Sequence, residues 1–263
     1  MSKTLKGTLI AGAVLICLGL VLVLAIGFSS GWDVTDSQWE KKEYVTTKGT
    51  TISDIDLNLT AGRLNIEFYR GSVIKVEYSE NKNVTTQCEV EGQTLKIQSI
   101  IHWHVQFLWF NKIPETTVYI PRDTQLNLKL QMDAGTVSVG EGQFNNVNIK
   151  MEAGVLSFAD TNCNNFDLNM NAGTMKVSKI QCSVFKVDIN AGTLNVAGLQ
   201  SHDITLDLSA GTAKLGVIGK KSEYNIRAEV SAGSCNVRNQ NGTTLKTISI
   251  DVSAGSANLS FDD

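Results

Sequence analysis

The chain has 263 residues, of which 42% are hydrophobic and 19% are charged, and its formal net charge is −3 at pH 7. That length suits one large domain or two small ones. The mild acidity argues against nucleic acid as a partner, because binding to phosphates needs a basic surface. Only three histidines occur, and no nucleophile-elbow, zinc-protease or phosphate-binding motif is present. The sequence therefore predicts a protein that is not an enzyme and that carries no cofactor.

Residues 8–28 are uncharged and rich in Leu, Val, Ile and Ala, which is enough to span a bilayer as a helix. Lysines precede this stretch and aspartates follow it, so the positive-inside rule keeps the N-terminus in the cytoplasm. We therefore expect a cytoplasmic N-terminus over 1–7, a transmembrane helix over 8–28 and a polar tether over 29–43. The predicted localisation is a cell membrane, with a single pass and the rest of the chain outside. A cleaved signal peptide is the alternative, although no A-x-A-like site follows.

Residues 44–121 contain one copy of a repeat and several segments that do not keep its period. SVIKVEY, TTQCEV, QTLKIQS and TTVYI alternate apolar and polar residues and are bounded by turn residues, as strands are. Terminal repeats are often atypical because they shield the end of a repeat core. This region is therefore predicted to be an irregular β lead-in or cap.

The segment 100–110, IIHWHVQFLWF, is the most apolar stretch after residue 43. One interpretation is a tip that touches a partner or lipid headgroups, and the other is a cover over the end of the core. The contact candidates are Trp103, Phe107, Trp109 and Phe110. His102 and His104 would share one face of a strand, but no third metal ligand accompanies them.

Eight copies of an alternating phrase centred on Ala-Gly run through the chain, the first at Ala61. From Ala134 to Ala210 the step is 19 residues each time, and the last two steps are 22. The predicted bends of the array are Ala134, Gly135, Ala153, Gly154, Ala172, Gly173, Ala191, Gly192, Ala210, Gly211, Ala232, Gly233, Ala254 and Gly255. A fixed period of this size is typical of a repeat architecture.

Within each copy the alternation changes phase at Ala-Gly. Leu168 and Met170 alternate with polar residues before the glycine, whereas Met175 and Val177 do so after it. A straight strand cannot bury both sets, so the chain must bend or bulge at Gly173. Each repeat is therefore expected to consist of two short strands joined by a tight bend.

These patterns predict an all-β fold in which residues 122–263 form a parallel β-solenoid, similar to a β-helix, of about seven stacked two-strand coils. One coil cannot bury enough apolar surface by itself, so neighbouring coils must supply the rest of the core. An antiparallel sandwich is the alternative, since evenly spaced short strands also suit one. The constant register favours parallel stacking.

Stacking in register would bring carboxylates together on the outer surface. Asp188, Asp207, Glu229 and Asp251 all lie three residues before an alanine and form a weak cation candidate, for example for Ca²⁺. The alternative is a solvated acidic stripe. Asp133 would lie over Glu152, a spacing that suits glycoside hydrolysis, but no further acid, tyrosine or arginine is repeated beside them.

Cys163 and Cys182 are 19 residues apart in consecutive polar turns. In a parallel stack their Cα atoms would lie about 4.8 Å apart, within the range that a disulfide tolerates. The alternative is a pair of free thiols. Cys88 has no evident partner, and Cys235 takes an inward position of the repeat.

The apolar N-terminal segment, the VYIP step at 118–121 and the succession of LxLxxAGxLxV copies resemble a bacterial domain family of unknown function whose members are regarded as adhesins with β-strand repeats. Its members are similar to membrane-anchored proteins encoded beside envelope-stress systems. The resemblance implies a non-enzymatic, membrane-anchored envelope protein that presents a rigid β-solenoid to an envelope polymer or a protein partner. The alternatives are an accessory regulator of an envelope-stress response, acting through a membrane partner, and a glycan-active enzyme.

Overall fold

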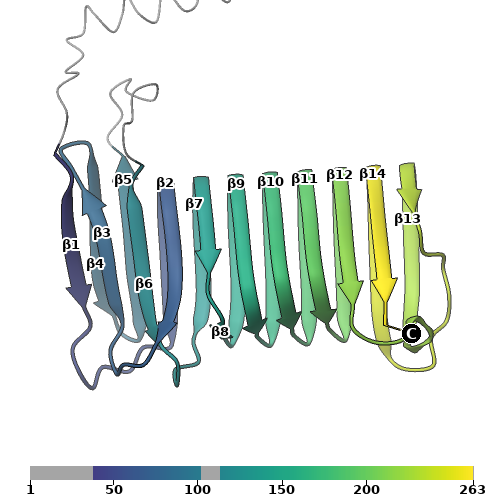
Figure 1. The fold of residues 1–263 in the computed structure, drawn as a ribbon, viewed down its shortest axis with the longest axis horizontal. Helices are drawn as coiled ribbons and strands as arrows, with labels where there is room; N and C mark the ends of the chain where they lie inside the picture. Colours follow the sequence, from purple (N-terminus) through teal and green to yellow (C-terminus); the bar gives the residue numbers. More distant parts are fainter. Residues whose placement is uncertain (1–37, 102–112, 263) are drawn as a thin grey trace, which may run out of the picture. The chain divides into compact units, whose positions relative to one another are not determined.

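A computed structural model describes residues 38–101 and 113–262, and Figure 1 shows their fold as a row of strands. The elements are β1 (Glu40–Val45), β2 (Asp54–Tyr69), β3 (Lys75–Glu80), β4 (Val84–Glu91), β5 (Thr94–Ile101), β6 (Glu115–Pro121), β7 (Asn127–Val139), β8 (Gly142–Gln143), β9 (Asn146–Asn162), β10 (Asn165–Gln181), β11 (Val184–Gln200), β12 (Asp203–Val217), the 3₁₀ turn η1 (Lys221–Glu223), β13 (Tyr224–Cys235) and β14 (Lys246–Phe261).

The strands form one 14-stranded sheet whose main order is β1-β3-β6-β2-β7-β9-β10-β11-β12-β14-β13. From β2 through β7 and β9 to β13 the neighbouring long strands are parallel, and their Ala-Gly pairs lie in register. β1 pairs antiparallel with β3, β3 with β6, and β4 with β5. The predicted stacking of equivalent repeat positions is therefore confirmed.

The predicted fold class is nevertheless wrong, although the all-β content is correct. The sheet is mixed rather than parallel throughout. Each repeat copy forms one continuous strand and not a two-strand coil, because the ladder continues across the bend from Ala172↔Ala191 to Thr174↔Thr193. The strands also do not follow chain order, since β14 lies between β12 and β13. A parallel β-solenoid of stacked two-strand coils is thus corrected to a mixed sheet of long strands.

The predicted transmembrane helix and single-pass membrane localisation are corrected as well. Over residues 38–101 and 113–262 no helix is long and apolar enough to cross a membrane. Residues 8–28, to which the helix was assigned, lie outside the described part of the chain. The last residues of the predicted tether belong to β1, which begins at Glu40.

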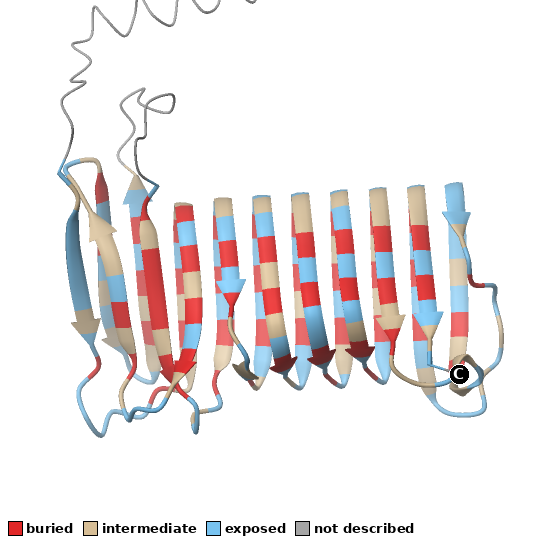
Figure 2. Cartoon of the chain, in the orientation of Figure 1, coloured by how far each residue is buried: buried red, intermediate tan, exposed pale blue. Residues whose placement is uncertain are grey.

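The predicted change of phase at Ala-Gly is confirmed by burial. In β10, Leu168 and Met170 are buried before the bend, and Met175 and Val177 are buried after it. Figure 2 shows the same alternation along the neighbouring strands. Since both sets belong to one core cluster, the strand folds back on itself at the glycine. In each long strand, the apolar residues of both halves therefore face the same core, and the alternate residues of each half face outward.

Glycine is needed at the bend for two reasons. Gly173 has a φ of 146°, a conformation that side chains rarely adopt. A Cβ added to Gly173 would also overlap the carbonyl oxygen of Gly154 on the adjacent strand. The same overlap with the neighbouring glycine recurs at Gly192 and Gly211. Backbone-to-backbone contact in this column thus sets the close stacking of the repeats.

Aromatic side chains form a column inside the array. Phe158 and Phe166 meet edge to face with ring centroids 5.3 Å apart, and Phe166 stacks on Phe185 at 5.4 Å. Phe166 and Phe185 are fully buried. Burying one such ring stabilises a fold by about 2–3 kcal/mol, so this column fixes the spacing and alignment of β9, β10 and β11.

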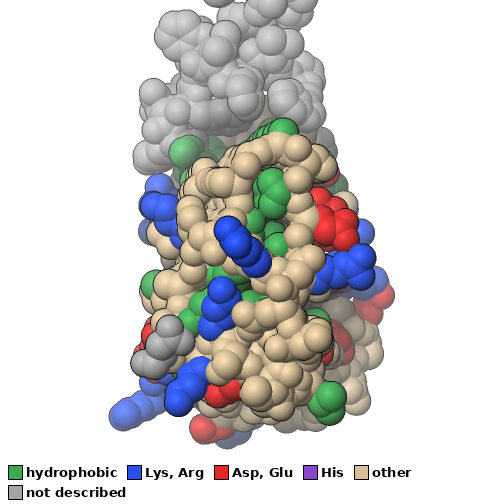
Figure 3. Space-filling model, turned by 90° about the vertical axis from the view of Figure 1, so that its right-hand side faces the viewer, with side chains coloured by type: hydrophobic (Ala, Val, Ile, Leu, Met, Phe, Trp, Pro, Cys, Tyr) green, Lys and Arg blue, Asp and Glu red, His purple; other side chains and the backbone are tan. Residues whose placement is uncertain are grey.

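The β13 end of the sheet is only partly covered. Ile226 exchanges two backbone hydrogen bonds with Gln240, which covers the first half of β13. The Tyr224 hydroxyl donates a hydrogen bond of 3.1 Å to the Ser201 carbonyl oxygen, and the Lys246 ammonium lies 5.3 Å from the centre of the Tyr224 ring. In Figure 3, which views this end, hydrophobic side chains are visible within a ring of backbone.

Candidate functional site

The most regular outer surface is formed by the strand halves that precede each Ala-Gly, and we call it the ladder face. It comprises the outward residues of these halves in β2, β7, β9, β10, β11, β12, β14 and β13. Because the strands pair in register, equivalent residues form rows across the sheet, with neighbours about 4.8 Å apart.

One row of the ladder face is an unbroken chain of side-chain hydrogen bonds. Asn127 donates through Nδ2 to Asp54 Oδ1 at 2.8 Å. Asn146 donates to Asn127 Oδ1 at 2.8 Å, and Asn165 donates to Asn146 Oδ1 at 2.6 Å. Asn127 and Asn146 thus each use one N–H and the side-chain oxygen within the row, and Asn165 uses one N–H, so each amide keeps a second N–H for another partner.

A second row lies directly beside the bends. Asn171 donates to Glu152, Asn190 donates through Nδ2 to Asn171 Oδ1 at 2.6 Å, and Ser209 reaches Asn190 Oδ1 at 3.5 Å. The Asp133 position adjoins Glu152, as predicted, since it falls between the pairs Met132↔Met151 and Ala134↔Ala153. Both carboxylates are exposed, and Glu152 serves as an acceptor at the end of this row.

The predicted acidic row is assembled, but in a different order. Asp188 pairs with Asp207, Asp207 with Asp251, and Asp251 with Glu229. Partial burial, with Asp188 and Asp251 on either side, raises the pKa of the Asp207 carboxyl above 3.8. Arg227 relieves the end of the row through an ion pair of 3.0 Å with Glu229.

The described residues give the cation interpretation of this row no support. In that part of the chain, no group of three or more His, Cys, Asp or Glu side chains is placed to hold a metal ion. Strand pairing alone therefore brings these acids side by side as a row, without closing them around one point.

The halves that follow Ala-Gly form a plainer surface. Their first row is made largely of hydroxyl side chains, such as Thr174, Thr193 and Thr212. The next row mixes Ser157, Lys176 and further polar residues. We call this surface the opposite face. It is formed by the same strands as the ladder face, so its residues can be substituted as matched controls for changes on the ladder face.

The remaining predicted site residues have separate outcomes. Trp103, Phe107, Trp109 and Phe110, with the two histidines among them, lie outside the described residues. Cys163 and Cys182 are free cysteines in this structure, so the predicted disulfide between them is not formed here. Cys235 is partly buried and packs against the core, as expected.

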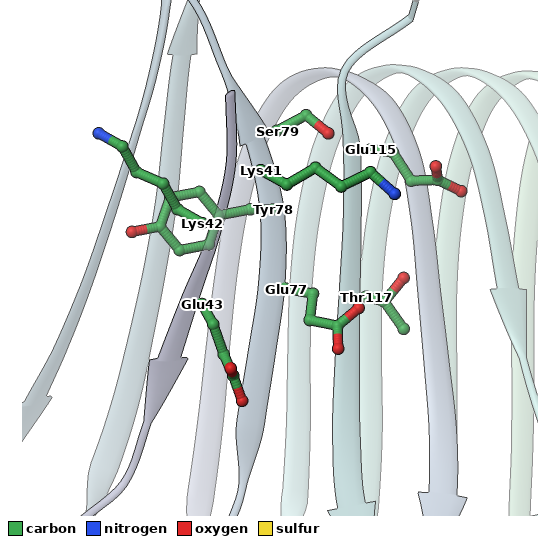
Figure 4. A pocket seen from close by; sticks show the side chains of 8 residues that line it. All are labelled: Lys41, Lys42, Glu43, Glu77, Tyr78, Ser79, Glu115 and Thr117. Carbon is green, nitrogen blue, oxygen red and sulfur yellow. The ribbon is translucent and has the colours of Figure 1, made fainter. Parts of the chain in front are cut away.

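Sequence reasoning missed a cavity of about 370 Å³ at the other end of the sheet, shown in Figure 4. β1, β3 and β6 line it with both charges, for example Lys41, Glu77 and Glu115. The Tyr119 hydroxyl donates to Glu77 at 3.3 Å nearby. Most of the segment that forms β1, residues 40–43, is part of the predicted tether, and its mixture of Lys and Glu gave no apolar signal for a strand.

A family model described as Toastrack DUF4097 matches residues 52–263. The chain belongs to the Toastrack DUF4097 family. The matched range includes the VYIP step at 118–121 and all eight Ala-Gly copies, which are two of the three features that carried the predicted resemblance, and the apolar N-terminal segment lies outside it. That prediction is confirmed, for a family whose function is unknown. A search of curated proteins returned no match to this Toastrack chain.

Solved structures similar to this Toastrack chain include a "putative cell adhesion protein" from Clostridium sporogenes, with 17% identity and a TM-score of 0.40, covering 86% of this chain and 100% of that one. Another is a "putative adhesin" from Parabacteroides distasonis, with 11% identity and a TM-score of 0.40, covering 85% and 98%. A third, from Bacteroides fragilis, has 13% identity and a TM-score of 0.36, covering 86% and 98%. At these values the likeness says nothing about a shared ligand.

Proposed function

We propose that this chain is a non-enzymatic, adhesion-type binding protein whose ladder face holds an extended polar polymer of the cell envelope. The observation that carries the proposal is the asparagine row from Asp54 to Asn165, whose amides are fixed by one another. Fixed amides lose little freedom when they bind, so each contact costs less than one made by a mobile side chain.

A repeating surface suits a repeating ligand. Neighbouring members of a row lie about 4.8 Å apart, and the asparagine row offers the same amide group at three successive steps, Asn127, Asn146 and Asn165. A polymer that runs along the row and meets several of its members at once binds far more tightly than its single contacts would suggest, because later contacts form intramolecularly. Glycans present hydroxyl groups along their whole length and match this requirement.

The alternative function is regulation through a protein partner, and the cavity beside β1 is the observation that favours it. Its lining carries Lys41 against Glu77 and Glu115, a mixed pattern that would select a partner segment with charges of both signs. Under this alternative, changes on the ladder face would leave partner binding unaltered.

Co-sedimentation of the full chain with insoluble cell-wall glycan tests the proposal. The double variant N146A/N165A removes two neighbouring amides from the row and should weaken binding by at least about tenfold, or about 1.4 kcal/mol. The matched control S157A/K176A alters the opposite face of the same strands and should bind as the unchanged chain does. Equal loss in both variants, or no sedimentation of the unchanged chain, would contradict the proposal.

A separate assay distinguishes binding from catalysis. The full chain is incubated with soluble wall fragments, and new reducing ends are measured. Our proposal expects none above the level of the D133N/E152Q variant, in which both neighbouring carboxyls are neutral. Turnover that disappears in this variant would instead establish a glycan-active enzyme.

A further inference from the structure

Cys163 and Cys182 occupy equivalent positions on two consecutive strands. Each follows the last residue of its strand, and those last residues, Asn162 and Gln181, pair in register. The Cys163 amide donates to the Gln181 carbonyl oxygen at 3.0 Å, and the Cys182 amide donates to the Gln200 carbonyl oxygen at 2.9 Å. Parallel neighbours of this kind have Cα atoms about 4.8 Å apart, within the range in which a disulfide forms without backbone movement.

The two thiols differ in their proton affinity. The Cys163 thiol donates a hydrogen bond to the Cys182 sulfur, which lowers the pKa of Cys182, and the Ser201 hydroxyl adds to this effect. Ser201 Oγ also lies 3.0 Å from the Ser183 and Asp203 carbonyl oxygens, so Cys163 is the main donor. The same hydrogen bond, together with burial, raises the pKa of Cys163. Cys182 is therefore the sulfur that ionises first, and the thiolate is the nucleophilic form.

A cavity of about 270 Å³ gives a small reagent access to both sulfurs. Its lining includes Cys163, Cys182, Asn164, Gln200 and His202, all at the strand ends. Cys182 itself is only 6% exposed, which favours a small oxidant over a bulky organic disulfide.

Cys88 lacks these features. It lies in β4, opposite Ile97 of β5. Burial, with Glu80 nearby, raises the pKa of its thiol to about 12. It therefore stays protonated at neutral pH and serves as an internal reference for an unreactive thiol.

We infer that Cys163 and Cys182 form a redox-active dithiol that a small hydroperoxide oxidises to a disulfide. With hydrogen peroxide, the Cys182 thiolate attacks one peroxide oxygen and the O–O bond breaks, which leaves a sulfenic acid on Cys182. The hydroxide that is released takes up the proton lost by the Cys182 thiol and becomes water. Cys163 sulfur then attacks the Cys182 sulfur, the S–OH bond breaks, and the departing hydroxide takes the Cys163 proton as water. The two thiols lose two electrons in total, and the peroxide gains them.

The test uses the full chain with Cys17, the one cysteine outside the described residues, replaced by serine so that it forms no other disulfide. The protein is treated with equimolar hydrogen peroxide, alkylated and mapped by mass spectrometry without reduction. We expect the Cys163 and Cys182 peptides to be linked, Cys88 and Cys235 to be alkylated, and dithiothreitol to restore both missing thiols. Full alkylation of Cys163 and Cys182, under conditions that oxidise free glutathione, would overturn the inference.

Single variants assign the roles of the two sulfurs. C163S should retain a sulfenic acid on Cys182 that dimedone labels, whereas C182S should leave Cys163 unlabelled. Circular dichroism verifies that both variants are folded, and C182A replaces C182S if the latter is not. Equal labelling of the two single variants, or labelling of Cys163 alone, would contradict the assignment.

Discussion

The regular array and the N-terminal part of the sheet reach the same core in different ways. In β9, β10 and β11, strands of 17 residues pair in parallel, residue by residue, at a constant offset of 19. In β1 to β6 most strands are of 6 to 8 residues, and parallel and antiparallel pairs are mixed. The 19-residue period thus determines which strands are neighbours only in the part of the chain that keeps this period.

The difference has a physical origin in the bend. Only a strand with Ala-Gly can fold back while its backbone touches the glycine of the next strand, as Gly154 and Gly173 do. This dipeptide is absent from β3, β4, β5 and β6. Each of these strands therefore extends along only one half of the length of a long strand. β5 pairs with the first half of β2, and β6 pairs with its second half. Two short strands therefore pair with β2 where one long strand would do so in the regular array.

The largest expected effect follows from replacing a bend glycine with alanine. Gly173→Ala combines an unfavourable φ with overlap against the Gly154 carbonyl oxygen, and we expect it to lower the free energy of unfolding by more than about 4 kcal/mol. Gly92→Ala in the N-terminal part has a φ of 62° and no atom near the added Cβ, so it should cost only about 1 kcal/mol. Urea unfolding measures both, and equal losses would disprove the role of backbone contact.

Truncating a core aromatic side chain should destabilise the protein more in the regular array than in the N-terminal part of the sheet. Phe166 is fully buried between two other rings, and Phe166→Ala should cost about 3–5 kcal/mol through lost burial and a cavity. Phe68 of β2 is 9% exposed and touches one ring, that of Phe144, so Phe68→Ala should cost less. Thermal unfolding compares the two variants, and a larger loss at Phe68 would refute the ranking.

A smaller effect is expected at the β13 end. Tyr224→Phe removes the hydrogen bond to the Ser201 carbonyl oxygen while keeping the buried ring. The loss should be about 1 kcal/mol, as for a typical buried hydrogen bond. Tyr119→Phe removes an exposed hydroxyl contact with Glu77 and serves as the control, with little change in unfolding expected.

The smallest effect concerns the acidic row. Asp207 has a pKa above 3.8 because of burial and the flanking Asp188 and Asp251. A carboxyl whose pKa is raised by folding stabilises the fold while protonated, and this contribution is lost as pH rises through the folded pKa. Asp207→Asn should therefore stabilise the chain at pH 7 by less than about 1 kcal/mol, with little gain below pH 3.8. Denaturation of both proteins at pH 7 and below pH 3.8 checks this prediction. A gain in stability that occurs only at the acidic pH would contradict it.

Sequence alone predicted the all-β content, the change of phase at Ala-Gly and the register of the array, because local alternation and a fixed period encode them. It could not predict that β14 separates β12 from β13, since the Ala210, Ala232 and Ala254 copies look alike and chain order is then the natural guess. It also assigned residues 40–43, the first part of β1, to the tether, because an edge strand with charges on its exposed side has no apolar alternation.

The ladder face was foreseen only in part. The acidic row was predicted from spacing, but the asparagine row was not, because its members occur in turns as often as in strands and their mutual hydrogen bonds depend on side-chain orientation. The position of Ser201 beside Cys182 could have been predicted, since Ser201 follows Cys182 by the same 19 residues that separate Cys163 from Cys182, but the sequence gives no sign that its hydroxyl would contact the Cys182 sulfur.

The exchanged order of the last two strands bears on how the chain matures. A ribosome releases β13 before β14, yet β14 occupies the place next to β12. Until β14 emerges, the nascent protein must therefore leave the edge of β12 unpaired, or pair it temporarily with β13. Loss of β14 would leave β13 without the strand that joins it to the rest of the sheet, so β14 completes the pairing of these three strands.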